Sequence, residues 1–574
     1  MHSLTLMYSF LQRLRLAPAI DNNSNLCTVC QSLLTGRRID KALGVTATAN
    51  LAQTFVQLED SVRNGCRLCR LRWNGLTSDQ RSELRLCEKV TFGFWQSSIG
   101  DGVVFEYWLD NKFAGMKPWL SLSVLMKAKA EVPTGLQDDY KAGSSTASPA
   151  ALNAACKQYL WIDSLCIVQD SKEDWEREAT LMERVYEYSY CNISAVKAAN
   201  TEEGIFSIRE PSLVRPVEVK TRWWPSLSPT KYYFWDPNIW DSNVDDSILL
   251  HRAWVTQERV LAPRILHFAE GQIFWECCSL RACETYPLGI PNNTSYKPSL
   301  DSHPLARQVL HSFQTPAVQR YHLWKMYVQL YTDSDLTNKT QDKFLAISGL
   351  ARKIGPPQDY VAGLWKPIFR RQLRWQAGEG CTRQQEWRAP TWSWASLDGL
   401  VYLEAPDEPN IEVRNHFTFD VIDIRVTLAT NDPFGPVLPG AALLLKASLL
   451  HVTVYKSDMH PVPVCIRLGG IIHAHVRLDV GFVQEGQTLF CMPLHIDLEK
   501  NMSLYGVVLE PVANREPGVF YRCGVFYVSN MEPGDQWVEM LSGLLKIGTE
   551  SRELGKMVGR LERLEWRLYE VTLL

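Results

Sequence analysis

One stretch of the chain, residues 159–196, most constrains what the whole can fold into. Tyr159–Asp163 (YLWID) is a short apolar run that stops at a carboxylate, a pattern typical of a central strand buried on both faces. We therefore expect Asp163 at the carboxyl end of that strand, where open α/β sheets place their functional sites. Asn192–Val196 (NISAV) has the pattern of the next strand. The stretch predicts a strand, a helix and a second strand, with a crossover long enough for parallel pairing.

The segment between these two strands has the pattern of an amphipathic helix. Ser171 precedes Asp174 by three residues, which is the spacing of a helix N-cap and its capping box. At roughly 100° per residue, one face of the helix is apolar; it contains Trp175, Ala179, Met182, Val185 and Tyr186. Glu178 falls within or at the edge of that face. Because burial raises the pKa of a carboxyl unless a positive group pairs with it, Glu178 is a candidate functional residue.

The cysteines near the start of the chain come in two pairs with the spacing of metal ligands. Cys27-x-x-Cys30 is followed by Cys66-x-x-Cys69, a combination found in four-cysteine zinc sites, although the interval between the pairs is longer than in compact zinc ribbons. Leucines flank both pairs, so the alternative is that the four thiols are reduced side chains packed in two helical turns. The first interpretation predicts one structural zinc ion per chain.

A second dense stretch, Arg252–Cys277, predicts a helix followed by a hairpin. Helical spacing of apolar residues runs up to Pro263, which would stop the helix, and Arg264–Phe268 and Gln272–Cys277 flank a turn at Gly271. The helix carries several polar groups, which form either a site or a solvated face with local ion pairs; they are Arg252, Gln257, Glu258 and Arg259.

Composition bounds the class of protein. The 574 residues are 46% hydrophobic and 21% charged, with a net charge of -3, as in a globular chain of several domains. Such a near-neutral charge gives no sign of a nucleic-acid partner, and we expect no membrane span, since no apolar run reaches the ~20 residues that one needs. The fifteen cysteines are odd in number and several lie inside apolar runs. They favour a reducing, cytoplasmic environment.

Several stretches together resemble the heterokaryon incompatibility (HET) domain of filamentous fungi. The similarity is carried by YLWIDSLCIVQDSKEDWEREATLMERVYEYSYCNISA, by RAWVTQERVLAPRILHF, and further along by Asp342-Lys343 with AISGL, YVAGLW and RAPTWSWASLDG. It extends over roughly residues 155–400. The opening strand of the family, with its ALSY-x-WG-like motif, has no counterpart, and PWLSLSVLMKAKAEVP and a polar linker stand in its place.

The resemblance implies a role in fungal non-self recognition, in which fusion of incompatible cells triggers cell death. It implies an α/β domain related to the Toll/interleukin-1-receptor-like fold, with a parallel sheet and helices. Some proteins of that fold cleave NAD with a glutamate on a helix, and Trp175-x-x-Glu178 matches their pattern. Carboxylates stabilise the positive charge that forms when a glycosidic bond breaks, so Asp163 is a second candidate, for a ribose hydroxyl. In the structural alternative, Glu178 is an ion-pair partner of Arg252 or Arg259.

These observations divide the chain into five expected regions. They are an N-terminal region with the paired cysteines (1–117), a diverged or truncated start of the HET domain with a polar linker (118–158), a HET core (159–290), a helical extension ending in WSWASLDG (291–416), and a β-rich domain with a terminal helix (417–574). Residues 88–125 also alternate as strands do.

Three functions remain open. We favour signalling by self-association or protein-partner binding. The alternatives are NAD cleavage by Glu178 and an inactive diverged or truncated relic.

Overall fold

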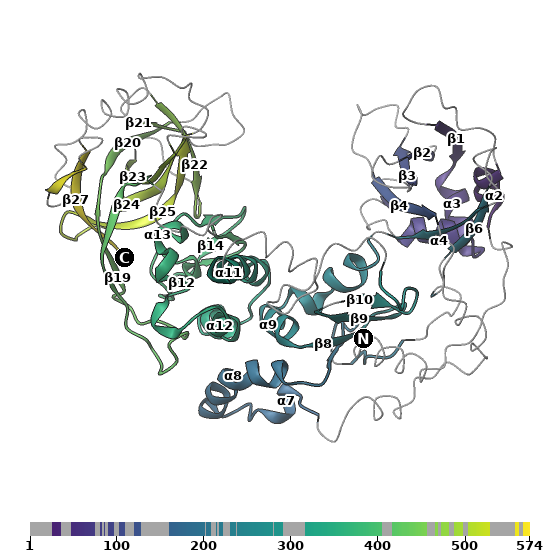
Figure 1. The fold of residues 1–574 in the computed structure, drawn as a ribbon, viewed down its shortest axis with the longest axis horizontal. Coiled ribbons are helices and arrows are strands. Elements are labelled where there is room, and N and C mark those ends of the chain that lie inside the picture. Colours follow the sequence, from purple (N-terminus) through teal and green to yellow (C-terminus); the bar gives the residue numbers. More distant parts are fainter. Residues whose placement is uncertain are drawn as a thin grey trace. The chain divides into compact units, whose positions relative to one another are not determined.

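The structure of the chain is a computed structural model that falls into two compact units, each assembled from separated parts of the sequence (Figure 1). The first unit comprises Met1–Leu160, Tyr190–Leu250 and Arg264–Tyr296, and the second comprises Trp161–Ser189, His251–Pro263 and Lys297–Leu574. The residues described are 26–35, 47–74, 81–82, 85, 90–96, 103–109, 120–127, 160–200, 202–207, 214, 217–221, 230–236, 238–278, 280–290, 316–404, 416–455, 465–468, 472–481, 487–497, 503–528, 557–561 and 566–574. No helix among them is long and apolar enough to cross a membrane.

An antiparallel sheet of six strands and three short helices make up the N-terminal part of the first unit. The strands lie in the order β1 (Ala47–Gln53), β2 (Val90–Gln96), β3 (Val103–Leu109), β4 (Leu120–Lys127), β7 (Thr230–Trp235) and β6 (Val217–Thr221). The alternation seen in residues 88–125 thus predicts strands correctly. The helices are α2 (Thr28–Thr35), α3 (Phe55–Arg63) and α4 (Arg67–Asn74). A capping box between Thr54 and Gln57 fixes the start of α3.

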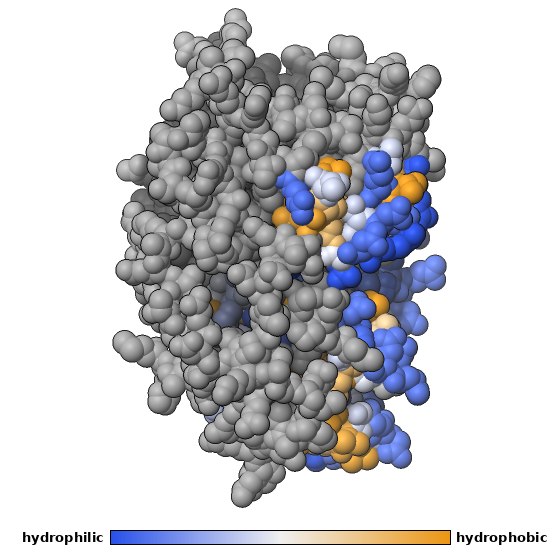
Figure 2. Space-filling view, turned by 90° about the vertical axis from the view of Figure 1, so that its right-hand side faces the viewer, coloured by the Kyte–Doolittle hydropathy of each residue, from blue (hydrophilic) through white to orange (hydrophobic). Residues whose placement is uncertain are grey.

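A second sheet in the first unit contains the predicted hairpin. Its order is β10 (Leu280–Cys283), β9 (Ile273–Cys277), β8 (Arg264–Phe268) and β5 (Asn192–Ser194). The hairpin β8–β9 is confirmed, and β5 pairs with β8 in parallel. The part of the first unit visible in Figure 2 carries small hydrophobic patches between hydrophilic residues, as far as its surface is described.

The strand predicted at Tyr159–Asp163 is wrong in its described part. Leu160 and Ile162 are exposed, and a single helical turn, α7 (Asp163–Cys166), begins at the carboxylate. The Asp163 side chain accepts a hydrogen bond from the backbone N–H of Ser164 at 2.7 Å, a local bond that favours turns and helix starts over a strand. The parallel partner of β5 is therefore β8. Because the two other pairings in this sheet are antiparallel, a Toll/interleukin-1-receptor-like parallel sheet is not confirmed.

Three helices of the second unit pack around a fourth, α12 (Asp342–Ile354). The three are α8 (Lys172–Glu187), α9 (Ala253–Leu261) and α11 (Pro316–Thr332). Ser171 caps α8 as predicted, since its side chain accepts from the N–H of Asp174 at 3.2 Å. Gly349 allows the close approach of these helices: a Cβ there would lie 2.8 Å from the Cβ of Glu183 on α8 and 2.8 Å from Oε1 of Gln257 on α9.

Tryptophans form the centre of the largest hydrophobic core, which extends from α11 and α12 into the C-terminal sheet. The indole of Trp394 donates to the carbonyl of Gly363 at 2.7 Å. Gly363 has φ +88°, and a Cβ at this position would lie 2.7 Å from Nε1 of Trp394, so only glycine fits here. Five tryptophans of this region are fully buried: Trp324, Trp365, Trp375, Trp392 and Trp394.

The C-terminal region is β-rich, as expected. Six of its strands pair in a closed antiparallel ring: β23 (Thr488–Asp497), β20 (Leu450–Tyr455), β21 (Cys465–Leu468), β22 (Ile472–Leu478), β25 (Val519–Val528) and β24 (Ser503–Pro511). The ring is continued beyond β25 by β27 (Trp566–Leu573), β19 (Ala442–Ala447) and β18 (Phe419–Arg425).

The terminal helix predicted for this region is wrong where the structure describes the chain, because those residues form strands; residues 541–556 and 562–565 lie outside the described part. They are β26 (Met557–Leu561) and β27, which pairs with β25 in parallel and with β19 antiparallel. In β27, Tyr569, Val571 and Leu573 are buried, and Glu570, which lies between the first two, is exposed. Tertiary pairing on both sides therefore overrides the helix-like distribution of charge.

Candidate functional site

The four cysteines of the two Cys-x-x-Cys pairs lie together in the first unit. Their sulfur atoms all lie within 4.8 Å of one another, and Sγ of Cys69 is 3.7 Å from Sγ of Cys27 and 3.5 Å from Sγ of Cys30. Tetrahedral zinc with Zn–S bonds of about 2.3 Å requires sulfur–sulfur distances of about 3.8 Å. Cys66 is the fourth cysteine of the cluster. The cluster could therefore bind a metal ion without a large rearrangement.

Two helix starts position this cysteine cluster. Cys27 directly precedes α2 and Cys30 lies in its first turn, while Cys66 and Cys69 stand in the same relation to α4. Unpaired N–H groups at a helix start stabilise a thiolate. Three of the four cysteines are buried and Cys27 is partly exposed, so the cluster has little contact with water.

The thiols strongly perturb one another. Hydrogen bonds from the other thiols, that of Cys30 first, lower the pKa of Cys27 far below its usual value. For Cys66 the contact with Cys27 raises the pKa, but hydrogen bonds with Cys30 and Cys69 outweigh it and lower the pKa to about 6. Contact with Cys27 raises the pKa of Cys69. The cluster thus shares negative charge among close sulfurs, which a divalent cation would neutralise.

The residues predicted for NAD chemistry lie in the second unit. Trp175, in the first turn of α8, packs its ring edge-to-face on Trp254 of α9 with ring centroids 6.3 Å apart. Glu178 follows one turn later with 20% of its side chain exposed, and it accepts from Arg177 at 3.3 and 3.2 Å. Its ion pair is therefore with its neighbour in the sequence instead of Arg252 or Arg259. Asp163 is exposed at the start of α7.

A different set of polar groups meets between α7, α8 and α9. Burial raises the pKa of Glu258 to about 7; a hydrogen bond from the Tyr186 hydroxyl and the charge of Arg252 oppose this rise, and the carboxylate of Asp163 adds to it. Burial also raises the pKa of Tyr186 above its usual value, with Glu258 as the next cause. We call Asp163, Tyr186, Arg252 and Glu258 the polar group.

The sequence predicts three members of the polar group, Asp163, Arg252 and Glu258, as candidate site residues. It does not predict Tyr186, which its spacing places on the apolar face of α8. The missed signal was its hydroxyl, because a buried tyrosine usually bonds its O–H to a partner. Chemically, a carboxylic acid with a pKa near 7 is able to give or take a proton at neutral pH.

Residues 144–258 match the model of the family described as heterokaryon incompatibility protein (HET). The chain contains a HET domain. The match confirms the resemblance noted in the sequence over residues 144–258. The whole polar group, from Asp163 to Glu258, falls within these residues. The comparisons with curated proteins and with solved structures returned no match.

Proposed function

We propose that this protein is a cytoplasmic component of fungal non-self recognition, in which the HET domain signals cell death by self-association or by binding a protein partner. The observation that carries the proposal is the number of large apolar side chains that the matched region leaves exposed. Ile162 and Leu165 on and beside α7, with Tyr188 after α8, are exposed, Leu165 by 78% and Tyr188 by 77%. Large apolar side chains left in water are typical of interaction sites.

Free thiols support the cytoplasmic part of this proposal. Among the described residues, eight cysteines carry free thiols: Cys27, Cys66, Cys69, Cys166, Cys283, Cys381, Cys491 and Cys523. Reduced cysteines in such number are typical of proteins kept in a reducing compartment.

The test of assembly is light scattering coupled to size exclusion over a wide range of protein concentrations. We expect the mass to rise with concentration, and Leu165→Asp to abolish the rise because a charge in an apolar contact is costly to desolvate. The matched control is Leu330→Asp on α11, where an apolar side chain is 46% exposed outside the HET match. A protein that stays monomeric at every concentration, alone and with fungal cell extract, would contradict the proposal.

A second candidate function is cleavage of NAD, and one observation favours it. Glu258, with its pKa of about 7, lies near enough to the Asp163 carboxyl for the two charges to interact. Glycosidic bond cleavage uses a pair of carboxyls of which one can hold a proton at neutral pH. Glu178 remains the residue that the sequence pattern proposes for this chemistry, with Trp175 beside it.

Nicotinamide release from NAD by concentrated protein tests this second function and assigns its residues. Glu178→Gln and Glu258→Gln are compared, and each keeps the shape of the side chain while removing its charge. Loss of release in one variant alone, with unchanged circular dichroism, identifies that glutamate as the acting carboxyl. If no release and no assembly occur, the inactive-relic interpretation is the correct one.

We also propose that the cysteine cluster holds one structural zinc ion. Support comes from the four thiol ligands and their short sulfur–sulfur distances, because a site closed by four protein ligands leaves no position for a substrate. Elemental analysis should find about one zinc per chain, and Cys66→Ser/Cys69→Ser should lose it and destabilise α2 and α4. The control Cys166→Ser, at an exposed cysteine, should keep the metal. Metal-free protein that is well folded would end the proposal.

A further inference from the structure

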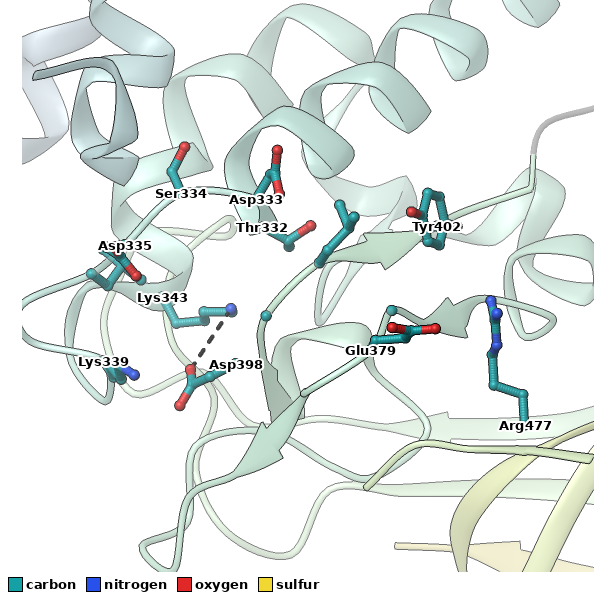
Figure 3. A pocket seen from close by; sticks show the side chains of 14 residues that line it. Thr332, Asp333, Ser334, Asp335, Lys339, Lys343, Glu379, Asp398, Tyr402 and Arg477 are labelled. Atoms are coloured by element: carbon teal, nitrogen blue, oxygen red, sulfur yellow. Dashed lines mark ion pairs between the residues drawn. The ribbon is translucent and has the colours of Figure 1, made fainter. Parts of the chain in front are cut away.

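A cavity in the second unit is lined by residues of two sequence motifs that the proposed function leaves unexplained. Its volume is about 490 Å³. Asp398 comes from the RAPTWSWASLDG motif and Lys343 from the Asp342-Lys343 motif, and the remaining walls come from the end of α11, from residues 378–379 and from Arg477 on β22. Figure 3 shows the Lys343 amine extending toward Asp398 in this cavity.

Lys343 is buried at the inner end of the cavity. Only 3% of the residue is exposed. Its Nζ atom is 3.9 Å from Oδ1 of Asp398, which is longer than a hydrogen bond, and it lies 5.7 Å from the ring centroids of both Tyr331 and Trp394. Burial, and next the charge of Arg388, lower the pKa of Lys343 to about 7. Near neutral pH much of this amine therefore carries a lone pair, which makes it a nucleophile.

Asp398 stays ionised beside that amine. Burial alone would raise the pKa of Asp398, but the hydrogen bond from Gln384 and the charge of Arg388 outweigh burial and lower it. Arg388 donates from Nη1 to Oδ1 of Asp398 at 2.7 Å. Because Arg388 already neutralises the carboxylate, Asp398 does not force Lys343 to remain protonated. Because Nζ and Oδ1 are 3.9 Å apart, a proton passes between the two groups through one bridging water or after a small shift of the lysine.

The outer wall of the cavity has hydroxyl groups and charges of both signs. The hydroxyls belong to Ser334 and Tyr402, the carboxylates to Asp333, Asp335 and Glu379, and the cations to Lys339 and Arg477. Thr332 also lines the cavity, but its hydroxyl donates to the Val328 carbonyl at 2.7 Å and accepts from the N–H of Val401 at 2.9 Å. Three carboxylates repel an anionic ligand and two cations repel a cationic one. Carboxylates and hydroxyls instead hydrogen-bond the O–H groups of a neutral ligand.

We propose that this cavity is a binding site for small, neutral carbonyl compounds that carry hydroxyl groups, and that Lys343 captures them as an imine. The amine lone pair attacks the carbonyl carbon to form a C–N bond, and a proton moves from nitrogen to oxygen. The C–O bond then breaks as the nitrogen forms the double bond, and water leaves with the second amine proton, relayed by Asp398. The balance is one amine and one carbonyl compound for one imine and one water, and no oxidant is required. The inference is independent of the function proposed for the HET domain.

Labelling with glyceraldehyde and sodium cyanoborohydride tests this site in the full chain at pH 7.5, with peptide mass spectrometry as the readout. The hydride reduces the imine to a stable secondary amine. The internal reference is Lys172 on α8, which is 81% exposed. We expect Lys343 to be labelled at least ~10-fold faster than Lys172, because the neutral fraction of an ordinary lysine with a pKa of about 10.4 is very small at this pH.

Recognition of hydroxyl groups is tested by repeating the labelling with propanal, which has the same chain length without them. For each aldehyde, the labelling rate of Lys343 is divided by the labelling rate of Lys172. This ratio should reach its plateau at a lower concentration of glyceraldehyde than of propanal. Lys343→Met should remove the fast label, and Lys366→Met, at an exposed lysine that does not line the cavity, should retain it. Three outcomes would overturn the proposal. Lys343 could be labelled no faster than Lys172, its labelling rate could rise linearly with glyceraldehyde concentration, or the two aldehydes could saturate it at the same concentration.

Discussion

At the scale of the residue, Glu258 gives the sharpest prediction for pH dependence. Its pKa is about 7 in the folded chain and 4.5 ordinarily, so the folded state holds a proton that the unfolded state releases. The stabilisation is fully present below about pH 4.5 and is lost as the pH rises through about 7. Glu258→Gln cannot ionise. The difference in unfolding free energy between the wild type and this variant should therefore fall by about 3 kcal/mol over that range.

Denaturant unfolding followed by tryptophan fluorescence at several pH values measures this difference. Tyr186→Phe provides a companion variant. It removes the hydrogen bond that lowers the pKa of Glu258. The pH range over which the stabilisation is lost should therefore move to higher pH. Parallel stability curves for the wild type and Glu258→Gln would show that the carboxyl is not perturbed.

Sequence patterns located some residues of the candidate sites well and others poorly. The two Cys-x-x-Cys pairs predict that they lie together in the fold, because the spacing typical of metal ligands is visible within each pair. Glu178 drew attention through its place on a helical face, yet Arg177 beside it satisfies its charge. Tyr186 and Glu258 are far apart in the sequence and are joined by tertiary packing. A single sequence does not encode such a meeting in any periodicity.

At the scale of the element, the packing of α8, α9 and α12 depends on Gly349. Substitution to alanine would place a methyl group 2.8 Å from the Cβ of Glu183 and 2.8 Å from Oε1 of Gln257. The glutamine end can move, but the Cβ of Glu183 moves only with its helix. We expect Gly349→Ala to destabilise the second unit by about 1–3 kcal/mol, measured by urea unfolding. Unchanged stability would mean that α8 shifts freely against α12.

Elements with caps and clear periods were predictable, whereas short apolar runs were not. Ser171 starts α8 and Pro263 follows α9 as expected, since caps and helix breakers act within one turn. YLWID had the apolarity of a strand, but a strand forms only beside a partner, and β8 became the partner of β5. The helix predicted for the charged terminal stretch is wrong because partners were available to it. Its described parts are strands, since neighbouring strands pair with them.

At the scale of the whole molecule, Arg522 ties the C-terminal sheet to the tryptophan core within the second unit. From β25, its guanidinium donates to Asp479 at 3.1 and 3.2 Å and to the carbonyls of Leu373 and Trp375 at 2.8 and 2.6 Å. Its guanidinium carbon lies 3.3 Å from the ring centroid of Trp375. Arg522→Met would leave the buried Asp479 charge poorly compensated, and we expect a loss of about 3–5 kcal/mol in unfolding free energy.

The control for this loss is Arg425→Met, which breaks an exposed ion pair with Asp423. A pair in water contributes little, so the change should stay below about 1 kcal/mol. Thermal and urea unfolding of both variants give the comparison. Similar losses in the two variants would show that burial of Arg522 is not what makes it important.

The position of β27 has a consequence for how the chain is made. This strand lies between β19 and β25, and the backbone of Leu574 pairs with that of Thr391 and Phe520. During synthesis on the ribosome, both neighbours are translated before residues 566–574 exist. The edge of β19 and the first residues of β25 then lack this partner, and unpaired edges readily join other chains. Nascent protein should therefore need protection by chaperones until β27 is translated.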